Sequence, residues 1–525
     1  MKSVCLYFNI HQPFRLKRYR FFDIGNDHYY YDDFANDEII ERMAEVSYIP
    51  MCETLLKMIE ESNREFKCAI SISGTAIEQL QQFVPECNEL LKKLADTGCV
   101  EFLGSPYAHG LASLEDIEEF IREVKEHSDL VKKVYGVKPK MFANTELIYD
   151  DDIAAVVASM GFKSILTEGA KHILGWKSPN YVYSPASAPG VKLLFTNRKL
   201  AEDITQNFNN PAWPEYPLTA DKYIDWIAAL PGEEQIVNLY MSMDTFGGFL
   251  PKDTGIFDFM RALPRFGKEK GVHFGMPSEV VAKLKPVGVM SVPSPISDID
   301  EARDVSAWKG NELQNEALNK LYAVAERVSL CQDRRLKQDW KYLQSSDHFY
   351  YMSTKNKADG ASHAAFSPYD SPFSAFTNYM NVLADFLVRV EEQYPDSIDN
   401  EELNSLLLTI RNQSSEINEL QKEVKNLRNN ILNSDELDKV PQVEMLEIAE
   451  KSDIEAPKKD KKDKADKKVK PAKKATAKTK SVKAKASKKA ATKKEAPVGD
   501  APKKRGRKPK AENVDKNVEN VDKAE

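Results

Sequence analysis

The run VCLYFNI at residues 4–10 is short and apolar, and it ends directly before His11. Similar runs recur along the chain as FKCAISIS (66–73), KMFANTEL (140–147), FKSILTEG (162–169), VKLLFTNR (191–198) and QIVNLYMSM (235–243). Several of these runs are apolar on both faces, which is typical of strands buried in a parallel sheet. Amphipathic stretches lie between them, such as residues 113–136 with Ser113 as the expected helix N-cap. This alternation predicts an α/β fold with a parallel sheet, either open or closed into a barrel.

The composition excludes several classes of protein. The chain has 525 residues with a formal net charge of −7, and 42% of them are hydrophobic, which is enough for a large core. It contains no run of 18 apolar residues, so a transmembrane helix is excluded. Its six cysteines form no CxxC pair, which argues against a zinc site or a disulfide framework. The N-terminal segment lacks the long apolar region of a signal peptide, so we expect a cytoplasmic protein.

The pattern changes after about residue 300, where helical periods predict a helical subdomain at residues 301–395 that packs on the α/β domain. Residues 401–432 form a separate unit in which apolar side chains recur every seven residues. One core position of successive heptads holds Leu403, Ile410, Ile417, Val424 and Ile431. The other core position, three residues later in each heptad, holds Leu406, Gln413, Leu420 and Leu427. This pattern favours a self-associating coiled coil, and the alternative is a helix that docks back on the body.

The end of the chain has a strongly basic composition. Residues 451–525 contain 27 Lys and Arg against 12 Asp and Glu, a balance of +15, whereas the preceding 450 residues carry −22. The segment has no Leu, Met or aromatic residue, so we expect a disordered tail. Within it, Arg505, Gly506, Arg507, Lys508 and Pro509 resemble an AT-hook, a peptide that inserts arginines into the minor groove of A·T tracts. The tail is therefore expected to bind DNA or another polyanion, and the alternative is a solubilising segment.

Polar residues gather where the predicted strands end. His11 directly follows the first predicted strand, and His109 is the last residue of the segment YAH (107–109). Glu146 is the last residue of the segment NTE (144–146), and Asp244 is the last residue of the segment SMD (242–244). In a barrel, the carboxyl ends of the strands carry the chemistry. Two carboxylates and two imidazoles are the side chains that glycosidic bond cleavage uses, and the alternative for each is a hydrogen-bonded turn residue.

These segments occur in a recognisable order: HQP, VEFLGSPYAHGL, FANTELIYDD, YMSMDTFGG, and then YYMSTK with FSPYDSPFSAF. Over about residues 1–390 the chain resembles glycoside hydrolase family 57, in its α-amylase branch. The resemblance implies an incomplete (β/α)7 barrel as a catalytic-type domain at residues 1–300, with a C-terminal helical subdomain. It also implies retaining hydrolysis or transfer at α-glucosidic bonds of an α-glucan or malto-oligosaccharide. No cofactor and no metal are implied, because the sequence has no phosphate-binding glycine loop and no metal-ligand cluster.

The resemblance assigns roles to individual residues. Glu146 matches the catalytic nucleophile, and His11 and His109 match histidines of the first and second motifs. The fourth motif departs from the family pattern Asp-Tyr-Glu-Thr-Phe-Gly, because Ser242 stands where the general-acid Asp is expected and Asp244 stands at the Glu. A serine does not protonate a glycosidic oxygen at a useful rate. Asp244 lies two residues along the same strand face and is the candidate replacement acid.

Further residues are candidates for sugar binding. Trp176, Trp308 and Tyr351 lie in or near the motifs, and aromatic rings stack on the apolar faces of pyranoses. Arg198 and Asp203 lie in NRKLAED and either pair with each other or contact the sugar.

Two functions of different classes follow. The first is an α-amylase-type glycoside hydrolase or glucanotransferase acting on α-1,4-glucan. The second is a catalytically impaired amylase-like protein that binds glucan, oligomerises and contacts polyanions. Glu146 favours the first, and Ser242 favours the second.

Overall fold

A computed structural model of the chain describes residues 2–355, 365–393 and 413. These residues belong to one compact unit, Met1–Ser415. The seam at residues 401–432, apart from residue 413, and the whole basic tail lie outside the described residues. The predictions for both segments therefore stay predictions.

The strands form two sheets whose pairing is mostly parallel. In the first, the order is β3-β2-β1-β8, with β9 beside the start of β1. In the second, the order is β10-β6-β7-β5-β4, and β6 and β7 are antiparallel. The strands are β1 (Lys2–Ile10), β2 (Cys68–Ile72), β3 (Val100–Phe102), β4 (Met141–Ala143), β5 (Ser164–Thr167), β6 (Val182–Pro185), β7 (Lys192–Phe195), β8 (Ile236–Ser242), β9 (Val272–Phe274) and β10 (Val289–Met290).

Two single parallel bridges join these sheets into a ring. Gly104, just after β3, pairs with Phe142 of β4, and Thr196, just after β7, pairs with Asn238 of β8. The parallel path through β1, β2, β3, β4, β5, β7 and β8 thus closes on itself. The α/β fold with a parallel, barrel-like sheet is confirmed. The strands β6 and β10 are not part of the ring, and they extend the sheet from β7.

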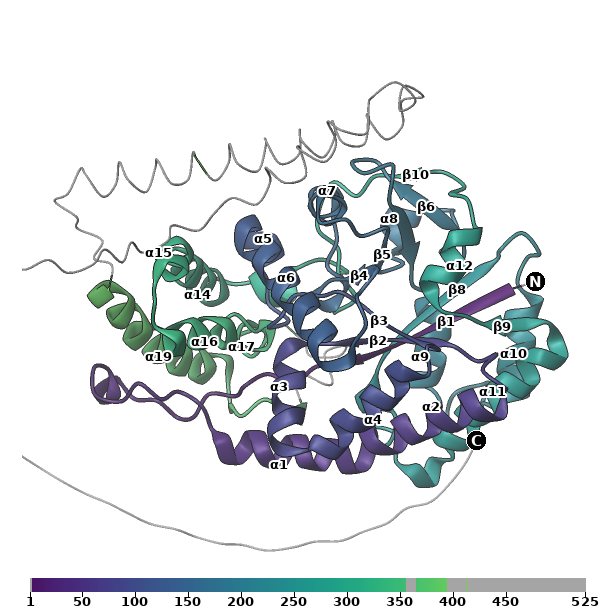
Figure 1. Cartoon of the computed structure of the whole chain (residues 1–525), viewed down its shortest axis with the longest axis horizontal. Helices are drawn as coiled ribbons and strands as arrows, with labels where there is room; N and C mark the ends of the chain where they lie inside the picture. Colours follow the sequence, from purple (N-terminus) through teal and green to yellow (C-terminus); the bar gives the residue numbers. More distant parts are fainter. Residues whose placement is uncertain (1, 356–364, 394–412, 414–525) are drawn as a thin grey trace, which may run out of the picture. The chain divides into compact units, whose positions relative to one another are not determined.

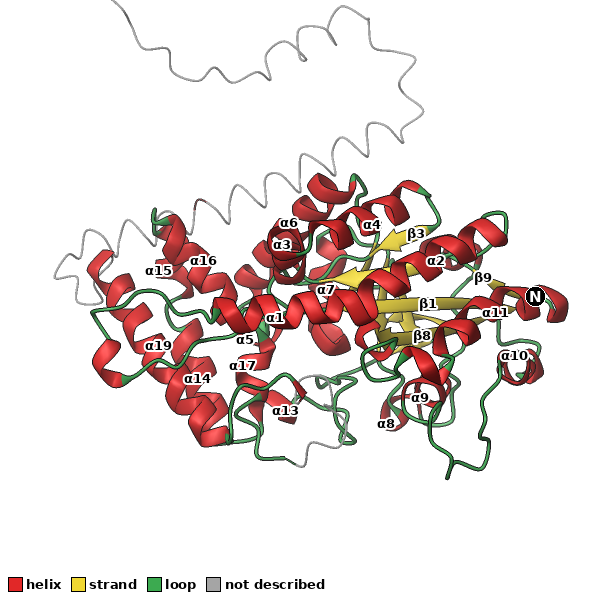
Figure 2. Cartoon of the chain, turned by 90° about the horizontal axis from the view of Figure 1, so that it is seen from below, coloured by secondary structure: helices red, strands yellow, loops and turns green. Residues whose placement is uncertain are grey.

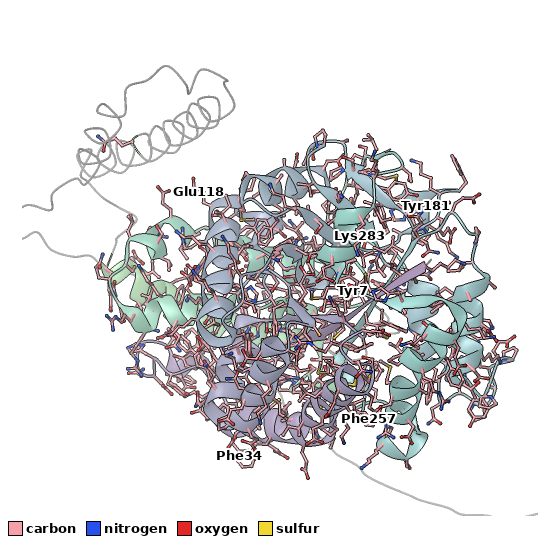
Figure 3. All side chains as sticks on the ribbon, turned by 45° about the vertical axis from the view of Figure 1, so that its right-hand side comes forward. Tyr7, Phe34, Glu118, Tyr181, Phe257 and Lys283 are labelled. Carbon is pink, nitrogen blue, oxygen red and sulfur yellow. The ribbon has the colours of Figure 1, made fainter. Side chains whose placement is uncertain are left out.

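The interior of the ring is filled by every second strand residue. On β1, Cys5 and Tyr7 belong to the inner cluster, whereas Val4, Leu6 and Phe8 pack on the outer helices. Tyr7 lies buried in the middle of the molecule (Figure 3), and its hydroxyl donates a 3.0 Å hydrogen bond to Oδ1 of Asn238. The two-residue period of the strands therefore decides which side chains reach the interior and, further along, the cavity at the strand ends.

Helices cover the outside of the sheet (Figure 2). In residues 2–300 they are η1 (Phe21–Asp23), α1 (Asp33–Met43), the π-helix η2 (Ala44–Tyr48), α2 (Ile49–Glu61), α3 (Gly74–Phe83), α4 (Pro85–Asp96), α5 (Ala112–Glu115), α6 (Ile117–Tyr135), η3 (Thr145–Leu147), α7 (Asp151–Ser159), α8 (Lys171–Leu174), α9 (Arg198–Thr205), α10 (Ala220–Ala229), η4 (Met243–Thr245), η5 (Lys252–Thr254), α11 (Ile256–Lys270) and α12 (Pro277–Lys283). One apolar core lies between β1, β2, β8 and helices such as α2 and α11. A second lies on the outer side of β4, β5 and β7.

The remaining described elements are helical and share that second core. They are α13 (Ser306–Lys309), α14 (Glu312–Tyr322), α15 (Ala325–Leu330), α16 (Arg334–Leu343), α17 (Ser346–Tyr350) and α19 (Pro372–Gln393). Figure 1 shows them on the side of the molecule to which the arrow of β1 points. This part of the chain therefore lies at the carboxyl ends of the strands, where the candidate site is found.

Candidate active site

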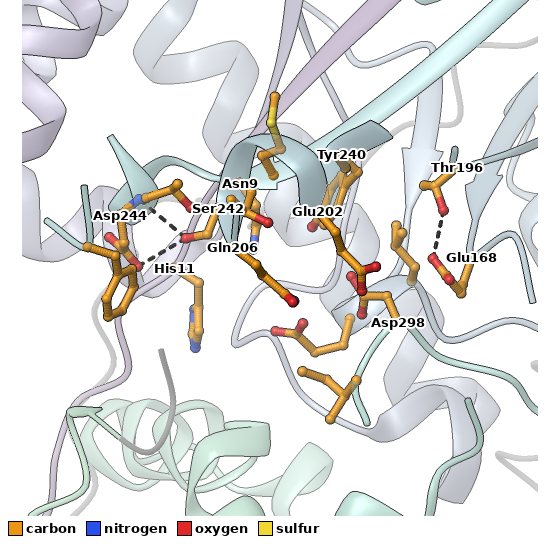
Figure 4. A pocket seen from close by; sticks show the side chains of 18 of the residues that line it. Asn9, His11, Glu168, Thr196, Glu202, Gln206, Tyr240, Ser242, Asp244 and Asp298 are labelled. Carbon is orange, nitrogen blue, oxygen red and sulfur yellow. Dashed lines mark hydrogen bonds between the residues drawn. The ribbon is translucent and has the colours of Figure 1, made fainter. Parts of the chain in front are cut away.

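A cavity of about 330 Å³ opens at the carboxyl ends of the strands (Figure 4). Its walls combine strand ends with the loops that follow them. The polar lining residues are Asn9, His11, Gln12, Arg15, Glu146, Glu168, Thr196, Arg198, Glu202, Thr205, Gln206, Tyr240, Ser242, Asp244, Thr245, Asp298 and Asp347. Because Tyr240 and Ser242 are two residues apart on β8, the strand period points both of them inward.

Glu146 follows β4 in a strained backbone. Its φ of 43° and the φ of 53° at Leu147 both lie in the left-handed region, which non-glycine residues rarely adopt. The side chain is buried, and Nε2 of His109 lies 2.8 Å from its Oε1, in hydrogen-bonding position. His109 also has a positive φ, of 55°. A strained backbone of this kind persists only where the surrounding structure holds the residue in one conformation. Here it holds the buried Glu146 carboxylate in a single position.

The two motif histidines lie against each other. The rings of His11 and His109 stack with centroids 4.1 Å apart and an interplanar angle of 22°. Nε2 of His11 lies 2.7 Å from Oδ2 of Asp347, and Nδ1 lies 2.8 Å from the hydroxyl of Ser73. The carboxylate makes Nε2 the donor, so the ring orientation of His11 is fixed at the cavity wall.

Asp244 is held by two hydroxyl donors. The Tyr48 hydroxyl donates to Oδ1 at 2.6 Å, and the Ser242 hydroxyl donates to Oδ2 at 3.1 Å. Gln12 in turn donates to the Tyr48 oxygen at 3.0 Å. Burial and the Asp244 carboxylate hold the pKa of Tyr48 well above its ordinary value, so this phenol stays a donor. Donors on both oxygens stabilise the ionised form of Asp244.

Close backbone packing places this loop. A Cβ at Gly247, whose φ is +95°, would lie 1.8 Å from the carbonyl oxygen of Val46, so only glycine fits there. Val46 lies in the π-helix η2, a type of irregularity that is frequent at functional sites. The same segment carries Tyr48, and its Ser47 donates to the carbonyl of Met243 at 2.7 Å.

A second group of carboxylates lies on the opposite side of the cavity from Asp244 and Ser242 (Figure 4). It contains Glu168, Glu202 and Asp298. Thr196 donates to Oε2 of Glu168 at 2.6 Å, and Arg198 forms an ion pair with Glu202. Burial raises the pKa of Glu168. Burial, together with the neighbouring charges of Glu146 and Glu168, raises the pKa of Asp298 well above its ordinary value.

The structure brings together some of the predicted residues. Glu146, His11, Arg198 and Asp244 line the cavity, as does Ser242. His109 lies behind Glu146 and is only 3% exposed.

The other predicted residues lie outside the cavity lining. Trp176 is 93% exposed after α8, whereas Trp308 is fully buried in the second core. Asp203, on the lining helix α9, and Tyr351, at the end of α17, are both buried, and neither is part of the lining. Residues 505–509 of the tail lie outside the described residues.

Sequence reasoning did not find the second carboxylate group. Glu168 ends the run FKSILTEG, so its strand-end position was a usable signal. Asp298 and Arg303 lie in an irregular segment without strand or helix pattern, and no signal in the sequence marks them. Tyr240 belongs to the quoted run QIVNLYMSM, but only the register of β8 shows that it faces the cavity.

In a comparison with known families, residues 5–293 match the sequence profile described as "Glycosyl hydrolase family 57". The chain belongs to this family. A protein of Methanocaldococcus jannaschii named "Putative alpha-amylase" is 40% identical over 399 residues, which cover 73% of this chain and 84% of that protein.

Solved structures show the same fold. A GH57-type branching enzyme from Pyrococcus horikoshii matches with a TM-score of 0.56 at 14% identity, over 79% of this chain and 94% of that one. A 4-alpha-glucanotransferase from Thermococcus litoralis matches with a TM-score of 0.53 at 14% identity, over 73% of this chain and 59% of that one. At this identity the similarity concerns the fold alone.

Two further findings concern the described residues only. Their helices include none long and apolar enough to cross a membrane. They also contain no group of three or more His, Cys, Asp or Glu side chains arranged to hold a metal ion.

Proposed function

We propose that the protein is a retaining glycoside hydrolase or transferase that acts on α-1,4-glucan or malto-oligosaccharide, with Glu146 as the nucleophile. The observation that carries the proposal is the position of Glu146. It lies at the end of β4, buried in the wall of the cavity, with a strained backbone and a hydrogen bond to His109. Membership of glycosyl hydrolase family 57 and the α-amylase-type relative support the substrate class.

In this mechanism the Glu146 carboxylate attacks the anomeric carbon and forms a glucosyl ester. His109 donates a hydrogen bond to the carboxylate and orients it for attack. The leaving glucan oxygen requires a proton from a second carboxyl group, which later accepts a proton from the incoming water or sugar hydroxyl. Asp244 and Asp298 are the candidates for this second group, on opposite sides of the cavity.

The cavity also supplies groups for binding sugar hydroxyls. Arg198 lies at its wall and can donate hydrogen bonds to sugar hydroxyls, whereas both ring nitrogens of His11 already bind Asp347 and Ser73. Phe249 and Phe366 line it as well, and they provide apolar faces against which a ring can stack. This mixture of a few fixed polar groups with aromatic walls is typical of a small-molecule site.

A second candidate function rests on one observation, the serine at position 242. Ser242 lines the cavity and donates to Asp244, so no carboxyl group stands at the family's general-acid position. The alternative is therefore an amylase-like protein that binds glucan and does not cleave it.

Trapping the covalent intermediate tests the proposal. Incubation with 5-fluoro-α-D-glucosyl fluoride should add one fluoroglucosyl group to the intact chain, and peptide mass spectrometry should locate it on Glu146. Glu146→Ala should lose both this adduct and the turnover of an activated aryl α-glucoside. Glu118→Gln, a change at an exposed position of α6, is the matched control and should keep both. Glucan binding without any adduct or turnover in the unmodified chain would favour the second candidate.

A further inference from the structure

Asp298 lies directly beside the proposed nucleophile. Its backbone N–H donates a 3.0 Å hydrogen bond to the carbonyl oxygen of Glu146. Two residues earlier, Ile296 pairs with Tyr149 in an antiparallel bridge, which fixes this segment against the loop after β4. Both Asp298 and Glu146 line the cavity, so their carboxyl groups face one substrate space.

Asp298 is half-buried, and its carboxyl group is incompletely satisfied. Its Oδ1 has no hydrogen-bond partner among the residues that the structure describes, although a shielded carboxyl oxygen without a partner is costly. The two nearby arginines, Arg198 and Arg303, both donate to the backbone carbonyl of Asp298. A carboxyl oxygen that is shielded from solvent and lacks a donor favours the neutral, protonated form of the group.

The surroundings of Asp298 favour its protonated form. Burial is the largest cause of its raised pKa, and the charges of Glu146 and Glu168 act in the same direction. The hydroxyl of Tyr240, which lies near both Glu146 and Asp298, also lacks a hydrogen-bond partner among the described side chains and backbone. Burial and these two carboxylates raise the pKa of Tyr240 well above its ordinary value, so the phenol stays a neutral donor at the cavity wall.

Asp244 differs from Asp298 in the hydrogen bonds that its carboxyl group accepts. Hydroxyl donors from Tyr48 and Ser242 occupy its two oxygens, and such donors stabilise a carboxylate rather than a carboxylic acid. A general acid must carry a proton at the working pH. Of the two carboxyl groups, Asp298 is the one whose unpartnered oxygen and neighbouring carboxylates favour the protonated form.

We propose that Asp298 is the general acid and base of this site, in place of the carboxyl group that Ser242 lacks. The proposal rests on the proposed function, since it concerns the same reaction. An acid next to a carboxylate nucleophile is the arrangement that a retaining mechanism needs, because the two groups act on the same glycosidic bond.

A Glu146 carboxylate oxygen bonds to the anomeric carbon, the bond from that carbon to the glycosidic oxygen breaks, and the departing oxygen takes the proton of Asp298. The products are a glucosyl ester on Glu146, a shortened glucan with a new hydroxyl group, and an Asp298 carboxylate. That carboxylate then removes a proton from water or from a sugar hydroxyl, whose oxygen bonds to the anomeric carbon and releases Glu146.

Leaving-group dependence and azide rescue test the assignment in the full chain. Asp298→Ala should lower kcat/KM on malto-oligosaccharide by about 10²–10⁴-fold, the usual contribution of general acid catalysis. It should still form the glucosyl-enzyme from 2,4-dinitrophenyl α-glucoside, whose leaving group needs no proton. Azide should then accelerate turnover and yield the α-glucosyl azide, because azide attacks the ester without a general base. Asp298→Asn should behave in the same way.

Controls separate this role from a structural one. Glu101→Gln removes a buried carboxylate outside the cavity and should leave both substrates and the azide effect unchanged. Asp244→Asn should affect the two substrates equally and show no azide rescue. Azide rescue in Asp244→Asn but not in Asp298→Ala or Asp298→Asn would overturn the assignment.

The outcome also separates this proposal from the proposed function. If turnover depends on Glu146 but stays unchanged in Asp298→Ala, only the role of Asp298 is overturned. If the unmodified chain forms no adduct from the fluoroglucoside and cleaves neither substrate, the proposed function fails and the role of Asp298 fails with it. Because rescue by azide requires a folded site, a rescued variant also excludes unfolding as the cause of lost activity.

Discussion

Glu146 and His109 hold each other in place although both have unusual backbone conformations. A left-handed φ at a non-glycine residue costs about 1–3 kcal/mol, and it persists only where the surroundings determine it. Here the surroundings include the 2.8 Å hydrogen bond between the two side chains and the stacking of His109 on His11. The strained backbone conformations therefore occur at Glu146 and His109, the two residues that take part in the proposed reaction.

Replacing Ser242 by Asp distinguishes the two candidate functions. If Asp298 already supplies the proton, Ser242→Asp should change kcat/KM on malto-oligosaccharide by less than about tenfold, since a second acid adds little. The new carboxyl group would also meet Asp244, whose Oδ2 now accepts the serine hydroxyl at 3.1 Å, and two such groups share one proton. Steady-state kinetics beside Ser242→Ala measure the effect. A rise of about 10²-fold or more would instead show that the unmodified site lacks an acid.

The sequence predicted one side of the site better than the other. Glu146, His11 and Asp244 follow recognisable strands, and all three line one cavity, whereas Glu168 also ends such a run and was not predicted. Asp298 reaches the cavity through an irregular segment that has no period to reveal its direction. Trp176 and Trp308 lie near the motifs but do not line the cavity, because an aromatic residue in such a segment can equally lie at the surface or in a core.

At the scale of elements, helix α6 carries charged groups into the interior. Glu123 is 2% exposed and accepts a hydrogen bond from the backbone N–H of Ala108, next to His109. Burial, with the charge of Glu119, raises the pKa of Glu123 to about 8. The helix thus supports the loop of His109 with a carboxyl group that is protonated at neutral pH.

This burial predicts a pH-dependent stability. Between the ordinary Glu pKa of about 4.3 and the folded value of about 8, the folded protein binds more protons at Glu123 than the unfolded chain does. Its contribution to the free energy of unfolding therefore falls as pH rises through this window, by up to about 1.4 kcal/mol per pH unit. Glu123→Gln should flatten the decline measured by urea unfolding at pH 5.5, 6.5 and 7.5. Glu118→Gln, on the exposed face of α6, should follow the unmodified chain, and a parallel decline in Glu123→Gln would contradict the prediction.

The elements themselves were predictable to different degrees. The apolar run at residues 4–10 lies within β1, and the runs at 66–73 and 235–243 contain β2 and β8, because buried parallel strands are nearly continuous apolar runs. The helix predicted over residues 113–136 divides into α5 and α6, and the predicted cap at Ser113 is wrong. The side chain of Asp116 accepts from the backbone N–H of Glu119 and starts α6 there. Short strands such as β9 depend on pairing partners, which local pattern does not contain.

The heptad repeat at residues 401–432 predicts self-association. Ile417→Asp places a charge in the apolar seam and should convert an oligomer into a monomer, because a buried unpaired charge is costly. Ser415→Asp adds the same charge two residues away, outside the seam, and should leave the oligomer intact. Sedimentation velocity of the full chain at micromolar concentration measures the difference. A monomer in every variant, with lower stability in Ile417→Asp, would favour a helix docked on the body.

The whole chain combines regions of opposite charge. The first 450 residues carry a net −22, and residues 451–525 carry +15. A cavity lined by Glu146, Glu168, Glu202, Asp244 and Asp298 has an acidic character that suits proton transfer to sugars better than the binding of anions. A polyanion would therefore be attracted to the tail rather than to the proposed active site.

The tail should bind DNA with strong salt dependence. Its 27 cationic residues would release counterions from the phosphates, so log K should fall linearly with log salt, with a slope of about −0.9 for each phosphate contacted. Fluorescence anisotropy with an A·T-rich duplex between 50 and 200 mM salt measures this slope, and a truncation at residue 450 should abolish binding. The double variant Arg505→Ala and Arg507→Ala should lose the preference for A·T tracts, because these arginines belong to the AT-hook-like peptide. Lys458→Ala with Lys459→Ala removes the same charge elsewhere in the tail and should weaken binding to all duplexes equally. Unchanged affinity after truncation, or affinity that does not vary with salt, would contradict the prediction.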